Sequence, residues 1–163
     1  MTYKLSHKSK LKLTNVHPDL VKCVKRAITL TKVDFCVLEG CRSTERQQEL
    51  YAAGASQIDG VKKRGKHQED ARTGYGHAVD LGAYIGGQVR WEFRPYFDIA
   101  RAMQLAGREF GVKLRWGGCW VYLNGAEKTL EKLVDEYVER KKAIGRSAFL
   151  DGPHFELDGR GIK

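Results

Sequence analysis

The sequence predicts a single α+β domain. The chain has 163 residues, an ordinary size for one compact domain, and 42% of them are hydrophobic, enough to bury one core. Segments with the apolar periodicity of helices are interspersed with short runs that are typical of strands. The sequence has no internal repeat and no low-complexity tract, so we expect residues 1–163 to form one domain.

The first regular elements are expected between residues 18 and 39. Apolar residues recur at intervals of three and four from Pro18 to Leu30, which predicts an amphipathic helix, and proline suits its first turn. Residues 34–39 (DFCVLE) then predict a short strand. The turn after this strand carries Arg42 and leads into the next helix.

That next helix is expected from Thr44 to about Ala53. Thr44 and Gln47 have the spacing of a capping box, and Gly54 stops the helix. The following residues 55–76 show no sustained periodicity and contain four glycines. A loop of this length in a small domain is usually either functional or disordered.

The middle of the chain predicts two strands around a helix. Residues 77–85 (HAVDLGAYI) predict a strand, and a Gly-Gly turn joins it to QVRW. Apolar positions on one face predict a helix over residues 95–111, closed by Gly111. Residues 112–116 (VKLRW) then alternate as a strand does.

The C-terminal part predicts one more helix and a last strand. Asn124 and Glu127 have capping-box spacing before apolar positions that recur from Leu130 to Val138, and the helix is expected to end near Gly145. Residues 151–157 (DGPHFEL) predict a turn that enters the final strand.

The positive charge of the chain is concentrated near its N-terminus. The net charge is +9, and up to Val33 eight Lys or Arg residues oppose one acid, a difference of +7. Nucleic acid, a membrane surface and bacterial cell-wall polymer all fit as anionic partners, and so does a solvated surface that only keeps the protein soluble. We expect no specific nucleic-acid partner, because no predicted helix combines clustered arginines with base-reading polar residues.

The sequence carries no signal for membrane insertion or secretion. No apolar run approaches the ~18–20 residues of a membrane span, and the first residues lack the apolar stretch of a secretory signal. We therefore expect the protein to stay in the cytoplasm where it is made unless another factor releases it. The cysteines have no C-x-x-C spacing and are expected to be free thiols. They are Cys23, Cys36, Cys41 and Cys119.

Three residues suggest a metal site. His67, Asp80 and His154 come from a predicted loop, a strand and a distant strand, and such separate regions can converge in a folded protein. A catalytic zinc ion needs about three imidazole or carboxylate ligands and leaves the remaining position for water.

Several longer motifs carry a resemblance to a known family. They are LEGCRSTERQQELYAAGAS (38–56), KHQ (66–68), GHAVDLGAYIGGQVRW (76–91), LAGREFGVKLRWGGCW (105–120) and DGPHFEL (151–157). On these motifs nearly the whole chain resembles the zinc D-Ala-D-Ala carboxypeptidase/dipeptidase group, and especially phage endolysins that are L-alanyl-D-glutamate peptidases. The resemblance implies a small antiparallel sheet flanked by helices, the Hedgehog/DD-peptidase-like fold.

The same resemblance implies roles for five residues. It implies that His67, Asp80 and His154 hold Zn²⁺, that Asp151 is the general base, and that Arg42 stabilises the oxyanion. The chemistry agrees, because bound zinc lowers the pKa of water to about 7 and a nearby carboxylate can pass the water proton to the leaving amine. An arginine fork suits an oxyanion or a substrate carboxylate equally well.

One departure from the family pattern leaves an alternative ligand open. Twelve residues separate His67 from Asp80, more than is usual in the family, so EDARTGY has the character of an insertion. His77 competes as a ligand, although its odd spacing from Asp80 directs it to the opposite face of a strand. Cys119 also stands where relatives often have Asp.

The expected function is a zinc endopeptidase that cuts the L-Ala–D-Glu bond of peptidoglycan stem peptides and so lyses bacterial cells. The protein would act as a monomer and would reach the wall from the host cytoplasm through a holin-type pore. Two alternatives stay open: a D-Ala-D-Ala carboxypeptidase or dipeptidase of the same fold, and a nonenzymatic zinc-containing module that binds the cell wall.

Overall fold

The computed structural model describes residues 2–159, and every predicted helix and strand is present in that range with bounds that differ by a few residues. The helices are α1 (His7–Lys12), α2 (Pro18–Leu30), α3 (Thr44–Ala52), α4 (Arg94–Phe110) and α5 (Leu130–Ala143). The strands are β1 (Phe35–Glu39), β2 (Ala78–Ile85), β3 (Gln88–Arg90), β4 (Leu114–Trp116) and β5 (His154–Leu157).

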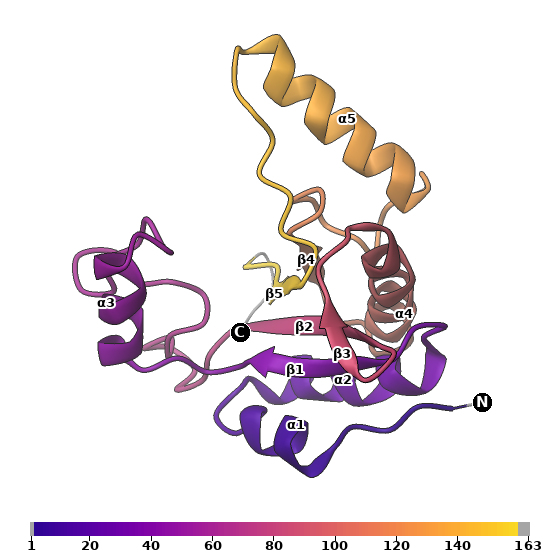
Figure 1. Cartoon of the computed structure of the whole chain (residues 1–163). Helices are drawn as coiled ribbons and strands as arrows, with labels where there is room; N and C mark the ends of the chain where they lie inside the picture. Colours follow the sequence, from indigo (N-terminus) through magenta and orange to yellow (C-terminus); the bar gives the residue numbers. More distant parts are fainter. Residues whose placement is uncertain (1, 160–163) are drawn as a thin grey trace.

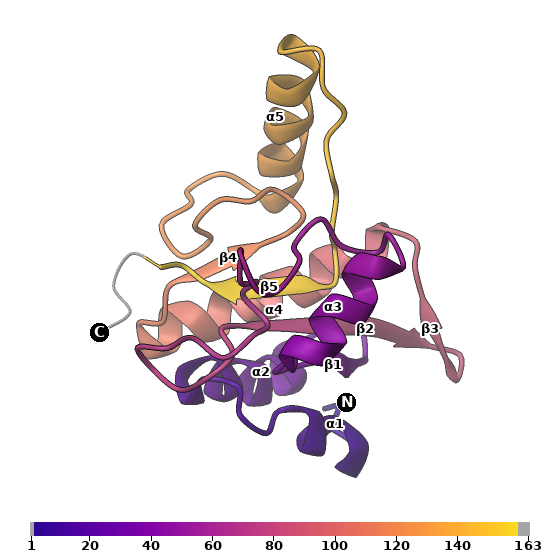
Figure 2. The same ribbon diagram turned by 90° about the vertical axis from the view of Figure 1, so that its left-hand side faces the viewer.

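The strands form one antiparallel sheet, which confirms the predicted α+β class. Their order is β1-β2-β5-β4, and β3 pairs with β2 as a hairpin. The helices α2 and α4 lie side by side and cover the sheet, whereas α3 lies beyond the end of β1 (Figures 1 and 2). The core between helices and sheet includes Leu20, Ile99, Leu81 and Phe155.

Helix α5 stands away from the sheet (Figure 1) and contacts α4, and its buried residues are Leu130, Val134 and Tyr137. The chain then returns to β5 as an extended segment over residues 146–150. The carbonyl of Phe149 in this segment accepts a hydrogen bond from Trp120 Nε1 at 2.9 Å.

Both predicted capping boxes are wrong in detail. The hydroxyl of Ser43, one residue earlier than expected, accepts from the Arg46 amide at the start of α3. Thr129 caps α5 in the same way, because Asn124 is used elsewhere, where its side-chain carbonyl accepts from the Leu114 amide. In both cases a hydroxyl directly before the helix satisfies a free amide of the first turn.

Helix α1 was not predicted. It has six residues, three of them lysines, and only Ser9 is buried, so no apolar periodicity marks it.

The four cysteines are free, and Cys23 and Cys119 are buried. No helix within residues 2–159 is long and apolar enough to cross a membrane.

Candidate metal centre

One row of side chains crosses three strands of the sheet. The register pairs Glu39 of β1 with Asp80 of β2, and Asp80 with His154 of β5. Residues paired in this way point to the same face of a sheet. An irregularity between Val37 and Glu39 allows this arrangement, because in a regular strand Glu39 would share the face of buried Val37.

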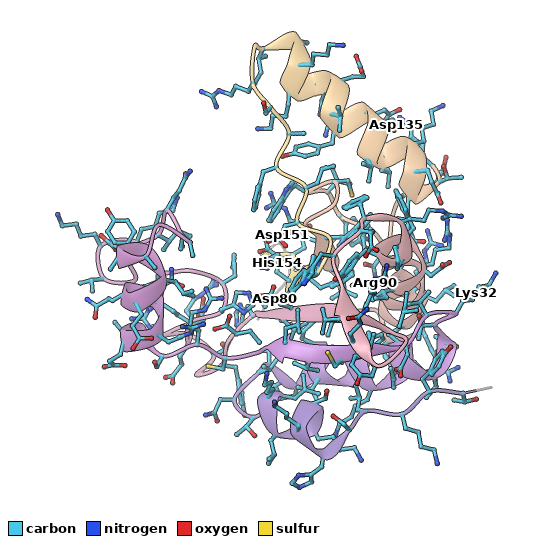
Figure 3. The ribbon with its side chains drawn as sticks, in the orientation of Figure 1. Lys32, Asp80, Arg90, Asp135, Asp151 and His154 are labelled. Carbon is cyan, nitrogen blue, oxygen red and sulfur yellow. The ribbon has the colours of Figure 1, made fainter. Side chains whose placement is uncertain are left out.

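His67 joins this row from the loop between α3 and β2. Its Nε2 lies 3.2 Å from Asp80 Oδ1, and His154 Nδ1 lies at the same distance from that oxygen. One ligand atom from each residue falls within 4.8 Å of the other two. Asp80, His154 and Asp151 lie close together beside β2 and β5 (Figure 3). The structure thus brings together the three metal-ligand candidates named from the sequence.

Each of the two histidine rings has an inner nitrogen beside Asp80 and an outer nitrogen on its other side, and the partners of the outer nitrogens show that His67, Asp80 and His154 fit a metal ion. His67 Nδ1 lies 2.9 Å from the carbonyl oxygen of Gly40, and His154 Nε2 lies 2.8 Å from a carboxylate oxygen of Glu156. A carbonyl or carboxylate oxygen only accepts, so in the neutral rings that a metal requires, the hydrogen lies on the outer nitrogen and the inner nitrogen, the one beside Asp80, has its lone pair available. Two imidazoles and a carboxylate arranged in this way can hold a metal.

Protons and a metal ion compete for this group. Burial by itself would raise the pKa of Asp80, but hydrogen bonds from His154 and His67 outweigh it and hold that pKa well below its usual range. Burial also disfavours the charged His154 ring, yet hydrogen bonds to Asp80 and Glu156 raise its pKa to about 9. Because metal ligation needs the neutral ring, binding of a metal releases this proton.

Two buried glutamines shape the loop that delivers His67. The Gln47 amide donates to the hydroxyl of Ser56 and to the carbonyl of Ile58, and the Gln68 amide donates to the carbonyl of Gly60. Gly60 has a positive φ of 81°, and a Cβ there would lie 2.7 Å from Gln47 Cγ, so only glycine fits. Hydrogen bonds from Gln47 of α3 and from Gln68 within the segment therefore hold the first part of residues 55–76 in place.

Arg42 lies beside the metal group but is held by other residues. Its Nε and Nη2 donate to the two carboxylate oxygens of Glu39 at 2.8 Å each, and its Nη1 donates to Gln47 Oε1 at 2.8 Å. Asp80 Oδ2 is 4.0 Å from Nη2. Of the five N–H donors of a guanidinium, three are used in these bonds, and two lie outside them.

Asp151 lies at the turn before β5, on the same side as the metal group (Figure 3). Its amide donates to the carbonyl of Gly117, and its carbonyl accepts from the His154 amide, which fixes the turn. A Cβ on Gly117 would lie 2.4 Å from the Asp151 carbonyl oxygen, so this close approach needs glycine. Burial raises the pKa of the Asp151 carboxyl, with the Asp80 charge adding to it. A raised pKa favours proton transfer near neutral pH.

Comparison with known proteins agrees with this geometry. Residues 1–158 match the family described as phage L-alanyl-D-glutamate peptidase. The chain belongs to this family. It is 31% identical over 121 residues to an L-alanyl-D-glutamate peptidase of Escherichia phage T5, a match covering 74% of this chain and 83% of that protein.

A solved structure has the same fold as this phage peptidase. The crystal structure of the Serratia marcescens L-Ala D-Glu endopeptidase ChiX matches this chain with a TM-score of 0.64 and 34% sequence identity. The match covers 94% of this chain and 89% of that one.

His77, the competing ligand, lies outside the metal group of this peptidase-family chain. Its Nε2 is 2.7 Å from the Thr73 hydroxyl, and its ring packs edge-on against His17 at 5.4 Å. Its Nδ1 is buried without a hydrogen-bond partner in the described structure. The segment that carries Thr73 therefore places His77 in a polar cluster separate from the metal group.

Sequence reasoning missed two carboxylates of the site and misjudged one glutamine. Glu39 holds Arg42, and Glu156 holds His154, but neither was singled out. Glu156 could have been found, because residues two apart on a strand share a face. Glu39 could not, since its position depends on the irregularity in β1. Gln47 was named only for a capping box, yet it is 1% exposed and accepts a hydrogen bond from Arg42.

Proposed function

We propose that the protein is a zinc endopeptidase that hydrolyses the L-Ala–D-Glu bond of peptidoglycan stem peptides. The observation that carries this proposal is the convergence of His67, Asp80 and His154 beside Asp151 in a chain of the phage L-alanyl-D-glutamate peptidase family. The named activities of the phage T5 and ChiX relatives support the same bond.

We propose zinc as the metal because the donor set is typical of catalytic zinc, which is often held by two histidines and one carboxylate. His67 would bind through Nε2, Asp80 through Oδ1 and His154 through Nδ1. When bound, zinc supplies a Lewis acid that polarises a carbonyl and acidifies water near neutral pH.

Asp151 would transfer the proton, and Arg42 would stabilise negative charge. The Asp151 carboxylate takes a proton from the attacking water and delivers it to the nitrogen of the leaving amine. The two unused N–H donors of Arg42 meet the negative charge that develops on the scissile carbonyl oxygen, or a carboxylate of the D-Glu residue. Glu39 and Gln47 keep the guanidinium in place, so little reorganisation is needed during the reaction.

We propose further that the chain acts as a single-domain monomer on bacterial peptidoglycan, with no sequence-specific nucleic-acid partner and no insertion into a membrane. A holin-type pore would release it from the host cytoplasm to the wall. This path fits its membership of a phage peptidase family.

Metal removal tests the zinc chemistry. Dialysis against a chelator is expected to abolish the clearing of purified Gram-negative peptidoglycan, and one equivalent of zinc should restore it. Metal analysis of the restored protein should find about one zinc per chain. Undiminished clearing by metal-free protein would contradict the proposal, whereas binding to peptidoglycan without clearing would favour the nonenzymatic alternative.

The basic N-terminal region predicts a separate effect on wall association. Lys8 and Lys10 are exposed on α1, and Lys32 at the same end of the chain lies well away from Asp80 (Figure 3). Replacing Lys8 and Lys10 with glutamine should slow wall lysis several-fold at low salt, because exposed charges are weakly screened there. Cleavage of a small soluble peptide should be unchanged.

A matched control removes the same charge elsewhere. Lys132 and Lys142 are exposed on α5, and glutamine at both positions should affect lysis less. Equal losses on wall and peptide, or equal losses for the two double variants, would contradict a role of the N-terminal charge in wall association.

A further inference from the structure

A buried carboxylate lies behind His154, on the side of the ring away from Asp80. Glu156 Oε2 is 2.8 Å from His154 Nε2, and the residue is only 6% exposed. Asp80 Oδ1 lies 3.2 Å from the other ring nitrogen, Nδ1. The ring of His154 is therefore held between two carboxylates, one inside the metal group and one outside it.

The sheet fixes Glu156 in this place. His154 and Glu156 are two residues apart on β5, so both side chains point to the same face. The register pairs Glu156 with Arg115 of β4, and Arg115 Nη1 lies 3.7 Å from Glu156 Oε1. The Trp120 carbonyl accepts a hydrogen bond from Arg115 Nε at 3.1 Å and so limits how far the guanidinium can move. Each carboxylate oxygen of Glu156 thus faces one nitrogen group.

We propose that Glu156 is a positioning residue that orients His154 toward the metal. A neutral imidazole has one N–H, and an acceptor fixed at Nε2 keeps the hydrogen there and leaves the lone pair of Nδ1 facing Asp80. The same hydrogen bond stops the ring from rotating about its bond to Cβ. This inference rests on the metal chemistry proposed above and assigns Glu156 no contact with metal or substrate.

Two substitutions of Glu156 distinguish the effect of its hydrogen bond to His154 from the effect of its negative charge. Glu156→Gln keeps an acceptor oxygen at the same distance but removes the charge, whereas Glu156→Asp keeps the charge but is one methylene too short to reach Nε2. If Glu156 positions the ring, zinc affinity should fall only slightly in Glu156→Gln and by about 10–100-fold in Glu156→Asp, the range usual for loss of such an outer partner. If it acts only through its charge, the order reverses.

The experiment is a zinc titration of each folded variant against a chromophoric chelator, with circular dichroism as a check of folding. Glu109→Gln is the control, because it removes a carboxylate that pairs with Arg26 between α2 and α4. Long-range ¹H–¹⁵N spectra of the zinc-loaded proteins add a direct readout. We expect the Nε2 proton of His154 to be protected from exchange with water in the original protein and in Glu156→Gln, and to exchange faster in Glu156→Asp.

The outcomes separate this inference from the proposed function. Equal zinc affinity in all folded variants, or a larger loss for Glu156→Gln than for Glu156→Asp, overturns the positioning role while leaving the metal site standing. Failure of the original protein to bind zinc overturns the proposed metal chemistry instead. Zinc binding with the expected order but no peptide cleavage supports the positioning role and overturns the peptidase proposal.

Discussion

Replacing Asp151 with asparagine should lower peptidase activity by about 10²–10⁴-fold while zinc stays bound. The reason is that asparagine has nearly the same shape but cannot accept the water proton, and general base catalysis typically contributes a factor of this size. The backbone hydrogen bonds that hold the turn at Asp151 do not involve its side chain, so the fold should persist. Cleavage kinetics on a soluble stem peptide, together with metal analysis, measure both parts.

Glu136 provides a matched control for Asp151→Asn. It is a carboxylate of α5 that pairs with Lys128, and Glu136→Gln should leave activity unchanged. Full activity in Asp151→Asn would show that the base is another residue. Loss of zinc together with activity would instead show that Asp151 supports the metal group.

Replacing His67 with alanine should abolish zinc binding and reduce activity to background, at least about 10²-fold below the original protein. This residue supplies one of the three inward-facing donor atoms, and catalytic zinc needs about three protein ligands. Metal content after dialysis and cleavage of peptidoglycan give the two readouts.

His77→Ala is the decisive comparison, because His77 was the competing ligand. Its ring contacts Thr73 and His17 rather than Asp80, so zinc content and activity should be retained. Loss of zinc in His77→Ala with retention in His67→Ala would reverse the ligand assignment.

Much of the fold could be predicted because local patterns agree with the packing. The apolar spacing in α2 and α4 matches the faces that these helices bury, and Gly111 ends α4 with a positive φ of 65° as expected. Helix α1 could not be predicted, since a short polar helix held by the Ser6 cap leaves no periodic signal. Residue spacing alone predicted the wrong capping residues. Thr44 and Asn124 instead accept hydrogen bonds from residues elsewhere in the fold, and Ser43 and Thr129 cap the helices.

The candidate site divides in the same way. The sequence motifs named His67, Asp80, His154, Asp151 and Arg42, and the structure gathers these residues on one side of the sheet. The supporting residues were harder to predict because they depend on strand register. Glu39 reaches Arg42 only through the irregularity in β1, and Gln47 turns inward because the loop over residues 56–60 folds against α3.

Fragment analysis shows whether this site cuts between L-Ala and D-Glu. Purified Gram-negative peptidoglycan is digested with zinc-loaded protein, and the products are identified by mass spectrometry. We predict stem peptides with a new amino-terminal D-Glu and glycan strands that keep L-Ala. Release of D-Ala alone, or no cleavage by protein that has bound zinc, would rule out cleavage between L-Ala and D-Glu as the activity of this site.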